Sequence, residues 1–518
     1  MTFNTTTMIP ENIRTDFEIL LSIVTNTDGK KCTADQMERH LFKQLLRLGA
    51  KLMQLHFEMR SEASSREETV NQKGERLAYH SEKSRSYYSI FGELAIRRPY
   101  FYIKGIGGYS PLDAELGLGE DSYSDFLREL HDELGVYMPF GKEVETIERL
   151  LTIGLSKRVA QQFIETDAAD VAAYYEQKEP PLVEEEGAIL VVQADGKGVP
   201  IIKSSANKDK VRLKRGEARS KKKAVTATAL YTIQAAVRTV DEIVANLLAE
   251  GQEKTTPNRS QPQHKQLWGT LAGKPAALDR LQGEVDKRKG NHIDHQVMLC
   301  DGDKSLQSHL RQRFPDFTLI LDFIHAYEYL WQVATTLYGQ DDPDRLPWVV
   351  EQTRHLLNGQ AFALATTFRQ LAQERGRTAS QRKILHKVAN YFENNQPYMD
   401  YATYLQHGWP IASGVIEGVC RHFVKDRMEL SGMRWSRIGA ENLLHLRAVA
   451  ENNDWEPYHR FRKQQRQQRL YQQDWPEEVF LPSLSTLVRR SASRSLADNK
   501  TAQSTKKNQS YERLPLVV

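Results

Sequence analysis

Two aspartates follow directly after apolar runs, and each stands just before a glycine. Asp195 ends the apolar part of residues 189–198, ILVVQADGKG, and Asp301 has the same place in residues 295–303, HQVMLCDGD. Carboxylates at strand ends can hold divalent cations through oxygen, and the glycines would let a phosphate approach closely. Two cations about 4 Å apart would stabilise both oxygens of an in-line phosphoryl displacement. The pattern favours such a metal site, although the first stretch by itself also fits a tight turn that holds an aspartate.

The elements between these acids indicate how they could meet. Apolar pattern and composition predict three strands first: one that ends at Asp195, one at 199–203 and one at 224–237. A helix at 240–250, loose polar chain at 252–265 and a helix at 276–289 are expected next. A strand that ends at Asp301, a helix at 304–313, a strand at 317–323 and a further helix follow. This is the order of a ribonuclease-H-like fold, an α/β core with a mixed sheet. Its first and fourth strands are parallel neighbours, so Asp195 and Asp301 would lie at adjacent strand ends, where open α/β sheets bind ligands.

A third metal ligand is expected from the helix after the last strand. Glu417 is the candidate, in the first turns of a helix that Ser413 would cap. A surface glutamate favoured by the helix dipole is the alternative there. Asp322 also ends a strand and is the rival second acid, with capping of the next helix as its other role. Because the fifth strand lies one place further from the first, Asp301 is preferred, and Asp322 and His325 are expected to support the ligands.

Basic residues gather in four places that suit a phosphate backbone. The candidate DNA contacts are Arg97 and Arg98 in a hairpin at 87–103; Lys157, Arg158 and Gln161 on the second helix of a helix-turn-helix outline at 143–176; Lys214, Arg215, Lys221, Lys222 and Lys223 in a run with ten basic residues between 203 and 223; and Arg421, Lys425 and Arg427 on the helix of Glu417. An ordinary hairpin, a plain helix pair and solvated surface are the alternatives. Residues 459–473 are expected to form a solvated basic helix.

Composition bounds the class of protein. The chain has 518 residues, enough for two to four domains, and a formal net charge of only +4, so bulk charge does not indicate a nucleic-acid partner. Three cysteines without a CxxC pair argue against a zinc ribbon or a disulfide framework and suit a reducing cytosol. The first residues lack the order of a signal peptide, and no apolar run approaches 18 residues. We therefore expect a soluble, cytoplasmic protein associated with the nucleoid, and no membrane partner.

The same patterns predict a division of the chain. The expected parts are a helical N-terminal region (1–84), a β-hairpin with a helix-turn-helix that binds DNA (85–178), the first part of the catalytic core (186–339), an all-α insertion (340–405), the completion of the core with Glu417 (406–485) and a basic disordered tail (486–518).

Three stretches resemble one family. They are ADGKGV at 194–199, the Asp-x-x-His of DFIHAYEYLW at 322–331, and above all PIASGVIEGVCRHFVKDRMELSGMRWSRIGAENLLHLRA at 410–448. Together they resemble bacterial insertion-sequence transposases of the ISKra group, relatives of the mutator-like DDE transposases. The resemblance extends from about Tyr88 to Glu456, so the first 85 residues and the basic tail lie outside it.

This resemblance implies a DDE transposase whose ribonuclease-H-like core is interrupted by a helical insertion. Asp195, Asp301 and Glu417 would be the catalytic acids and the ligands of Mg²⁺ or Mn²⁺, with two ions expected, and Asp322 and His325 would fill the Asp-x-x-His signature. The expected partners are element ends with inverted repeats and target DNA, bound by a homo-oligomer. A structure-specific nuclease with the same fold and a non-catalytic DNA-binding descendant are the alternatives. A glycosidase with two carboxylates would not need the basic segments.

Overall fold

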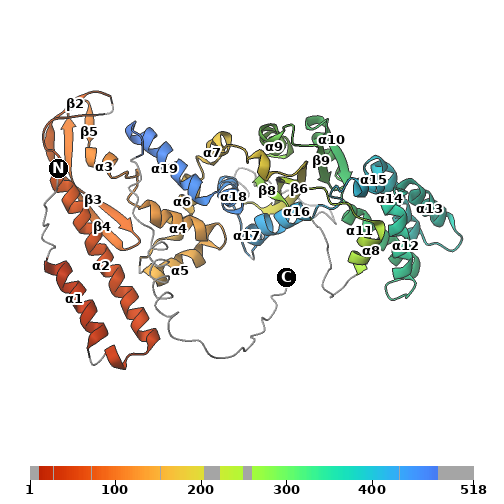
Figure 1. Cartoon of the computed structure of the whole chain (residues 1–518), viewed down its shortest axis with the longest axis horizontal. Helices are drawn as coiled ribbons and strands as arrows, with labels where there is room; N and C mark the ends of the chain where they lie inside the picture. Colours follow the sequence, from red (N-terminus) through yellow and green to blue (C-terminus); the bar gives the residue numbers. More distant parts are fainter. Residues whose placement is uncertain are drawn as a thin grey trace, which may run out of the picture. The chain divides into compact units, whose positions relative to one another are not determined.

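The computed structural model describes residues 11–26, 29–71, 73–151, 153–202, 222–248, 260–430 and 432–475. The helices and strands named below belong to one compact unit, Met1–Gln473 (Figure 1). No helix in these ranges is both long and apolar enough to cross a membrane. The predicted tail (486–518), most of the basic run (203–221) and residues 249–259 lie outside the described residues.

A mixed five-stranded sheet forms the centre of the α/β part. Its strands are β6 (Ile189–Pro200), β7 (Lys222–Ile233), β8 (Gln263–Thr270), β9 (His295–Cys300) and β10 (Thr318–Leu321). They lie in the order β10-β9-β6-β7-β8. β6 is parallel to β9 and β9 to β10, whereas β7 is antiparallel to both β6 and β8. The expected parallel neighbourhood of the strands that carry Asp195 and Asp301 is therefore present.

Helices cover both faces of this sheet, which explains why its central strand is an unbroken apolar run. Ile189 and Val191 pack with Phe323 and Leu330, whereas Leu190 and Val192 face the other way, toward a second group of helices. The helices of the two faces are α11 (Phe323–Tyr338) on the first, and α9 (Lys274–Arg288) and α10 (Lys304–Arg313) on the second.

Two predicted strands need correction. The strand predicted at 199–203 is not separate in its described part, 199–202, because β6 continues to Pro200 and pairs with β7 along its whole length. The missing strand is β8, whose first three residues lie in the polar segment expected to be loose (252–265). Its outer residues are polar because β8 is an edge strand, and only Leu267, Trp268, Gly269 and Thr270 are buried. The sequence prediction thus had the correct number of strands with one of them misplaced.

The chain between β10 and Ser413 is helical, as expected. Its helices after α11 are α12 (Arg345–Leu357), α13 (Ala361–Gln373), α14 (Ala379–Asn395) and α15 (Tyr401–Gln406). They share one apolar cluster with the α11 face of the sheet, to which α8 (Val240–Leu248) also contributes (Figure 1). This cluster fixes the point at which the chain returns to the sheet.

The N-terminal part combines helices with a small antiparallel sheet. Its elements are α1 (Glu11–Thr25), α2 (Ala34–Ala63), β1 (Thr69–Val70), β2 (Arg76–Leu77), β3 (Tyr79–Ser89), β4 (Gly92–Ile103), β5 (Gly107–Tyr109), α3 (Pro111–Glu115), α4 (Asp125–Gly135), α5 (Phe140–Leu151), α6 (Lys157–Asp167) and α7 (Val171–Gln177). The predicted hairpin is β3 and β4. Ser156 caps α6 as predicted, accepting from the Val159 N–H, but the expected second helix ends at Asp167 and α7 is separate.

The C-terminal helices are α18 (Arg437–Glu451) and α19 (Trp455–Tyr471). The expectation that 459–473 is a solvated basic helix is wrong. Arg462 is buried and pairs with Asp167 on α6 at 2.6 Å, and Arg466 pairs with Asp125 on α4 at 2.5 Å. Arg462 and Arg466 therefore attach α19 to α6 and α4.

Candidate active site

The site lies where the parallel strands β6 and β9 stop pairing. β6 pairs with β9 from Ile189 opposite His295 to Gln193 opposite Leu299, and then continues only with β7. Asp195 lies two residues beyond the last of these pairs, inside a strand and not on a turn as predicted. A side chain added at Gly196 would meet open space, so the backbone beside Asp195 is accessible.

Three aspartates stand at one edge of three adjacent parallel strands, where the parallel pairing ends. Asp195 is on β6, Asp301 directly follows β9, and Asp322 directly follows β10. This edge is where open α/β sheets bind ligands. Burial raises the pKa of Asp301 above its ordinary value; the Asp303 backbone N–H opposes the change and the negative charge of Asp195 adds to it. The two acids therefore interact, and a cation between them would remove an unfavourable charge pair.

The carboxylate of Asp322 is already fully engaged by the protein. Its Oδ1 accepts from the N–H groups of Ile324 and Ser413, each at 3.1 Å, and its Oδ2 accepts from the Ser413 hydroxyl at 2.8 Å. His325 Nδ1 lies 2.6 Å from the same Oδ2. Burial opposes ionisation of this side chain, but these donors outweigh it and lower the pKa of Asp322. The hydrogen bond with Asp322 in turn raises the pKa of His325 to about 9.

Residues 413–420 cross this edge of the sheet and are held at three points. Ser413 binds Asp322, the Ile416 N–H donates to Gln193 Oε1 at 2.9 Å, and the Cys420 thiol lies 3.3 Å from Asp195 Oδ2. The segment begins with α16 (Gly414–Gly418) and continues as a π-helix, Val419–Lys425, a rare form that is frequent at functional sites. The contacts connect the ends of β10 and β6, and Glu417 lies between them.

Glu417 meets Asp322 and His325 directly. One ligand atom from each of the three side chains lies within 4.8 Å of the other two. The Ser413 hydroxyl also lies 3.3 Å from Glu417 Oε1, and burial together with the charge of Asp322 raises the pKa of Glu417. The residues expected to support the ligands are thus immediate neighbours of Glu417, and Asp195 is connected to this group through Cys420.

The two glycines of the predicted motif differ. Gly196 is open, but a side chain at Gly302 would collide with the ring of Tyr391 on α14. The prediction that both glycines make room for a phosphate is therefore wrong for Gly302, where the space is occupied by an aromatic ring. Tyr391 encloses the Asp301 side of the site.

Three contacts at the site were not predicted from the sequence. Gln193 is fully buried, accepts from Ile416 and donates from Nε2 to the Tyr231 hydroxyl at 2.9 Å. Ser413 was expected only as a helix cap, yet its side chain makes no cap hydrogen bond and binds the acids instead. Cys420 looked like part of an apolar face. A polar residue inside the run ILVVQA was the one signal that could have indicated Gln193.

Two of the expected DNA contacts are structural. Arg98 pairs with Asp113 beside Arg85 and is largely buried. Arg427 is 1% exposed; its Nε donates to the Gly135 carbonyl at 2.9 Å, and its guanidinium lies 4.9 Å from the Trp435 ring centroid. Burial lowers the pKa of Arg427 to about 10. The Arg427 side chain is held inside the fold and cannot contact DNA, whereas Arg98 is held by Asp113 with 17% of its side chain exposed.

The remaining candidates are distributed as follows. Arg97, Lys157, Arg158, Gln161, Lys223, Arg421 and Lys425 are exposed, with Gln161 donating to Glu165 at 2.8 Å. Lys222 pairs with Glu429. Lys214, Arg215 and Lys221 lie outside the described residues.

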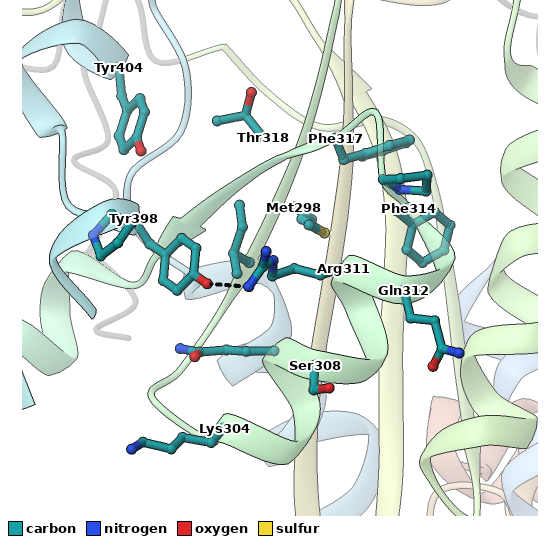
Figure 2. Close-up of a pocket in the computed structure, with 14 residues that line it drawn as sticks. Met298, Lys304, Ser308, Arg311, Gln312, Phe314, Phe317, Thr318, Tyr398 and Tyr404 are labelled. Atoms are coloured by element: carbon teal, nitrogen blue, oxygen red, sulfur yellow. Dashed lines mark hydrogen bonds between the residues drawn. The ribbon is translucent and has the colours of Figure 1, made fainter. Parts of the chain in front are cut away.

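A separate cavity of about 660 Å³ lies beside α10 and β10 (Figure 2). Arg311 donates to the Tyr398 hydroxyl across it at 3.0 Å, and Lys304 is a second basic side chain in its lining. None of its lining residues is acidic, so it is not an alternative metal site.

No family model and no curated protein matches the chain. Among solved structures, the chain is similar to the "Drosophila P element transposase strand transfer complex", with a TM-score of 0.23 and 8% identity, over 76% of this chain and 90% of that one. A TM-score of this size does not define a shared fold, so the function proposed below rests on the residues of this chain.

Replacing Arg427 tests whether it is structural. Arg427→Met should lower the free energy of unfolding by about 1–3 kcal/mol, because the buried Gly135 carbonyl loses its donor. Arg421→Met, at an exposed position of the same helical segment, is the matched control and should change stability by less than about 0.5 kcal/mol. Denaturant unfolding measures both, and equal effects would contradict the structural role of Arg427.

The His325–Asp322 pair predicts a pH dependence of stability. The pKa of His325 is raised from 6.5 to about 9 in the folded chain, so its contribution is complete below pH 6.5 and is lost as pH rises through 9. In EDTA, the wild-type melting temperature should therefore fall over this range more than that of His325→Gln. Thermal unfolding at several pH values measures the difference. Parallel pH profiles would show that the pair does not stabilise the fold.

Proposed function

We propose that the chain is a DDE-type DNA transposase of the ISKra group with a ribonuclease-H-like core. The observation that carries the proposal is the set of acids at one sheet edge: Asp195 and Asp301 on adjacent parallel strands, with Glu417 held above the same edge by contacts to β6 and β10. The order β10-β9-β6-β7-β8, in which β7 alone runs antiparallel to the other strands, supports the ribonuclease-H-like assignment. The long motif around Glu417 supports the family.

The donor set suits a hard divalent cation. Asp195, Asp301 and Glu417 offer carboxylate oxygens, the ligands that Mg²⁺ and Mn²⁺ prefer. Among the described residues, the donor to the Asp301 carboxylate is the Asp303 N–H at 3.0 Å, which leaves most of its lone pairs for a ligand. Asp322 has its four acceptor positions in use. We therefore retain Asp301 as the second acid and give Asp322 the role of fixing His325 and Ser413 beside Glu417.

Bound ions would activate a water or a 3′-hydroxyl and stabilise the leaving oxygen at a phosphodiester. The acids would hold the ions at the opening between β6 and β9, and the open backbone at Gly196 would leave room there for a phosphate attracted by the ions. Protonated His325 would add positive charge beside Glu417. Hydrolysis at the element end would come first, and attack of the freed 3′-hydroxyl on target DNA would follow at the same acids.

The exposed basic residues would hold the DNA. Lys223 and the basic residues that precede it in the sequence would bind the phosphate backbone of the DNA. Arg421 and Lys425 lie on the segment that carries Glu417. Such contacts give affinity without sequence information. Reading of the element ends is assigned to α6, where Lys157, Arg158 and Gln161 are exposed.

A structure-specific nuclease is the second candidate, because the same acids would cut DNA without joining it. Inverted repeats on both sides of the gene would favour the transposase. Incubation of the protein with DNA that carries these flanking sequences and a target plasmid separates the two: a transposase yields joined products, and a nuclease yields only cuts.

The roles of Asp301 and Asp322 can be separated by two amide substitutions. Asp301→Asn should reduce cleavage by about 10³-fold or more, through loss of a metal ligand, while DNA affinity and melting temperature stay near wild type. Asp322→Asn should instead lower the melting temperature, because its amide nitrogen cannot accept from Ser413 or Ile324. A cleavage-competent Asp301→Asn would show that the second acid is wrongly chosen.

Mutation of residues that bind the DNA backbone and mutation of residues that contact the bases should have different effects on DNA affinity. Neutralising Lys221 and Lys223 should weaken binding to element ends and to scrambled DNA alike, and lower the salt slope of log affinity by up to about 2. Replacing Arg158 and Gln161 with Ala should cost about 1–3 kcal/mol mainly on the ends, where base edges are read. Binding to both DNAs at several salt concentrations gives these values. Equal loss on both DNAs from the α6 variant would make α6 structural.

A further inference from the structure

Helix α2 has an apolar stripe with coiled-coil spacing. The stripe consists of Leu41, Leu45, Leu48, Leu52, Leu55 and Met59, at alternating intervals of four and three residues. Leu45, Leu52 and Met59 are 56%, 48% and 45% exposed, although α2 belongs to a folded part of the chain. Six consecutive heptad positions without a polar residue require a partner surface.

The rest of α2 is already occupied by its own chain. Phe57 is buried in a cluster with Leu94 and Ile96 of β4, and the Gln54 side chain bonds the backbone of Ala95. None of the six stripe residues belongs to this cluster. A 3.6-residue period puts most of the stripe on the side of α2 away from Phe57.

Helix α1 leaves the stripe accessible. It runs beside α2 (Figure 1), with Asp16 paired to Lys51, and a cavity between the two helices is lined by Leu20, Lys43 and Arg47. None of the residues around that cavity is a stripe residue. The stripe thus lies off the β4 side, and Leu45, Leu52 and Met59 stay exposed with α1 in place.

We propose that this stripe joins two copies of the chain through an α2–α2 coiled coil. A 3.5-residue repeat is complementary to another helix, and not to a strand, which would need a period of two. The stripe on a second copy has the same residues and spacing, so a twofold axis along the helices places each stripe residue on its own copy, leucine on leucine in five layers and methionine on methionine in the sixth. The inference does not depend on the proposed catalytic function.

The available area suits a reversible dimer. Leu45, Leu52 and Met59 are about half exposed, and Leu41, Leu48 and Leu55 are less exposed. With the stems of their neighbours, the six side chains would bury roughly 1,000 Å² in total over two copies, near the lower limit for specific interfaces. Because β4 and α1 already hold α2 in a helix, association does not have to order it. We therefore expect a dissociation constant in the micromolar range.

Sedimentation equilibrium of the full chain, without DNA or metal, tests the proposal. Between about 1 and 100 μM the wild type should change from monomer to dimer. The double variant Leu45→Glu/Leu52→Glu should weaken association at least about 100-fold, because it places four charges in the seam. Phe362→Glu, at an exposed apolar position of α13 (64% exposed), is the matched control and should dimerise as the wild type does. Unchanged melting temperatures would show that the variants fold.

A disulfide gives an independent readout of the same contact. In a Cys32→Ser background, which removes the exposed native thiol, Leu52→Cys should form a cross-linked dimer on mild oxidation because Leu52 is central in the stripe. A wild type that stays monomeric at 100 μM, or a glutamate variant that dimerises normally, would overturn the proposal. Since no DNA is present, neither result bears on catalysis.

Discussion

The side-chain amide of Gln193 connects the central strand to the segment that carries Glu417. It is fully buried in β6, two residues before Asp195, and accepts from the Ile416 N–H while donating to Tyr231. It stands at the last residue of β6 that pairs with β9. This position therefore lies where β6 and β9 stop pairing, and its side chain holds the segment of Glu417 to the central strand.

The carboxylates at this edge of the sheet differ in how far the protein stabilises their negative charge. Asp322 is buried and fully hydrogen-bonded, and its pKa is lowered. Asp301 and Glu417 have raised pKa values, for burial and nearby carboxylates work against their charge. The protein thus stabilises one carboxylate that orients His325 and Ser413, and leaves others whose charge a cation would stabilise. The same contrast separates Arg427, held inside the fold, from Arg421 on the surface.

Much of the sheet could be predicted, because apolar runs buried on both faces have a strong sequence signature. Thus β9 and β10, and the acids after them, were found. β8 was missed because an edge strand needs few apolar residues, and Asp195 was put on a turn because Asp-Gly-Lys-Gly is typical of turns. Arg427 was misassigned because its partner, the Gly135 carbonyl, is distant in sequence. The contacts of Gln193 and Ser413 required the tertiary structure for the same reason.

We propose that Asp195, Asp301 and Glu417 hold divalent cations together at the opening between β6 and β9. Anomalous diffraction from crystals grown with Mn²⁺ locates such ions without any assumption about substrate. We expect manganese peaks within coordination distance, about 2.0–2.6 Å, of Asp195 and Asp301 carboxylate oxygens, with Glu417 directed to the same ions. Manganese bound only by Asp322, His325 and Glu417, or absent from this edge at saturating concentration, would contradict it.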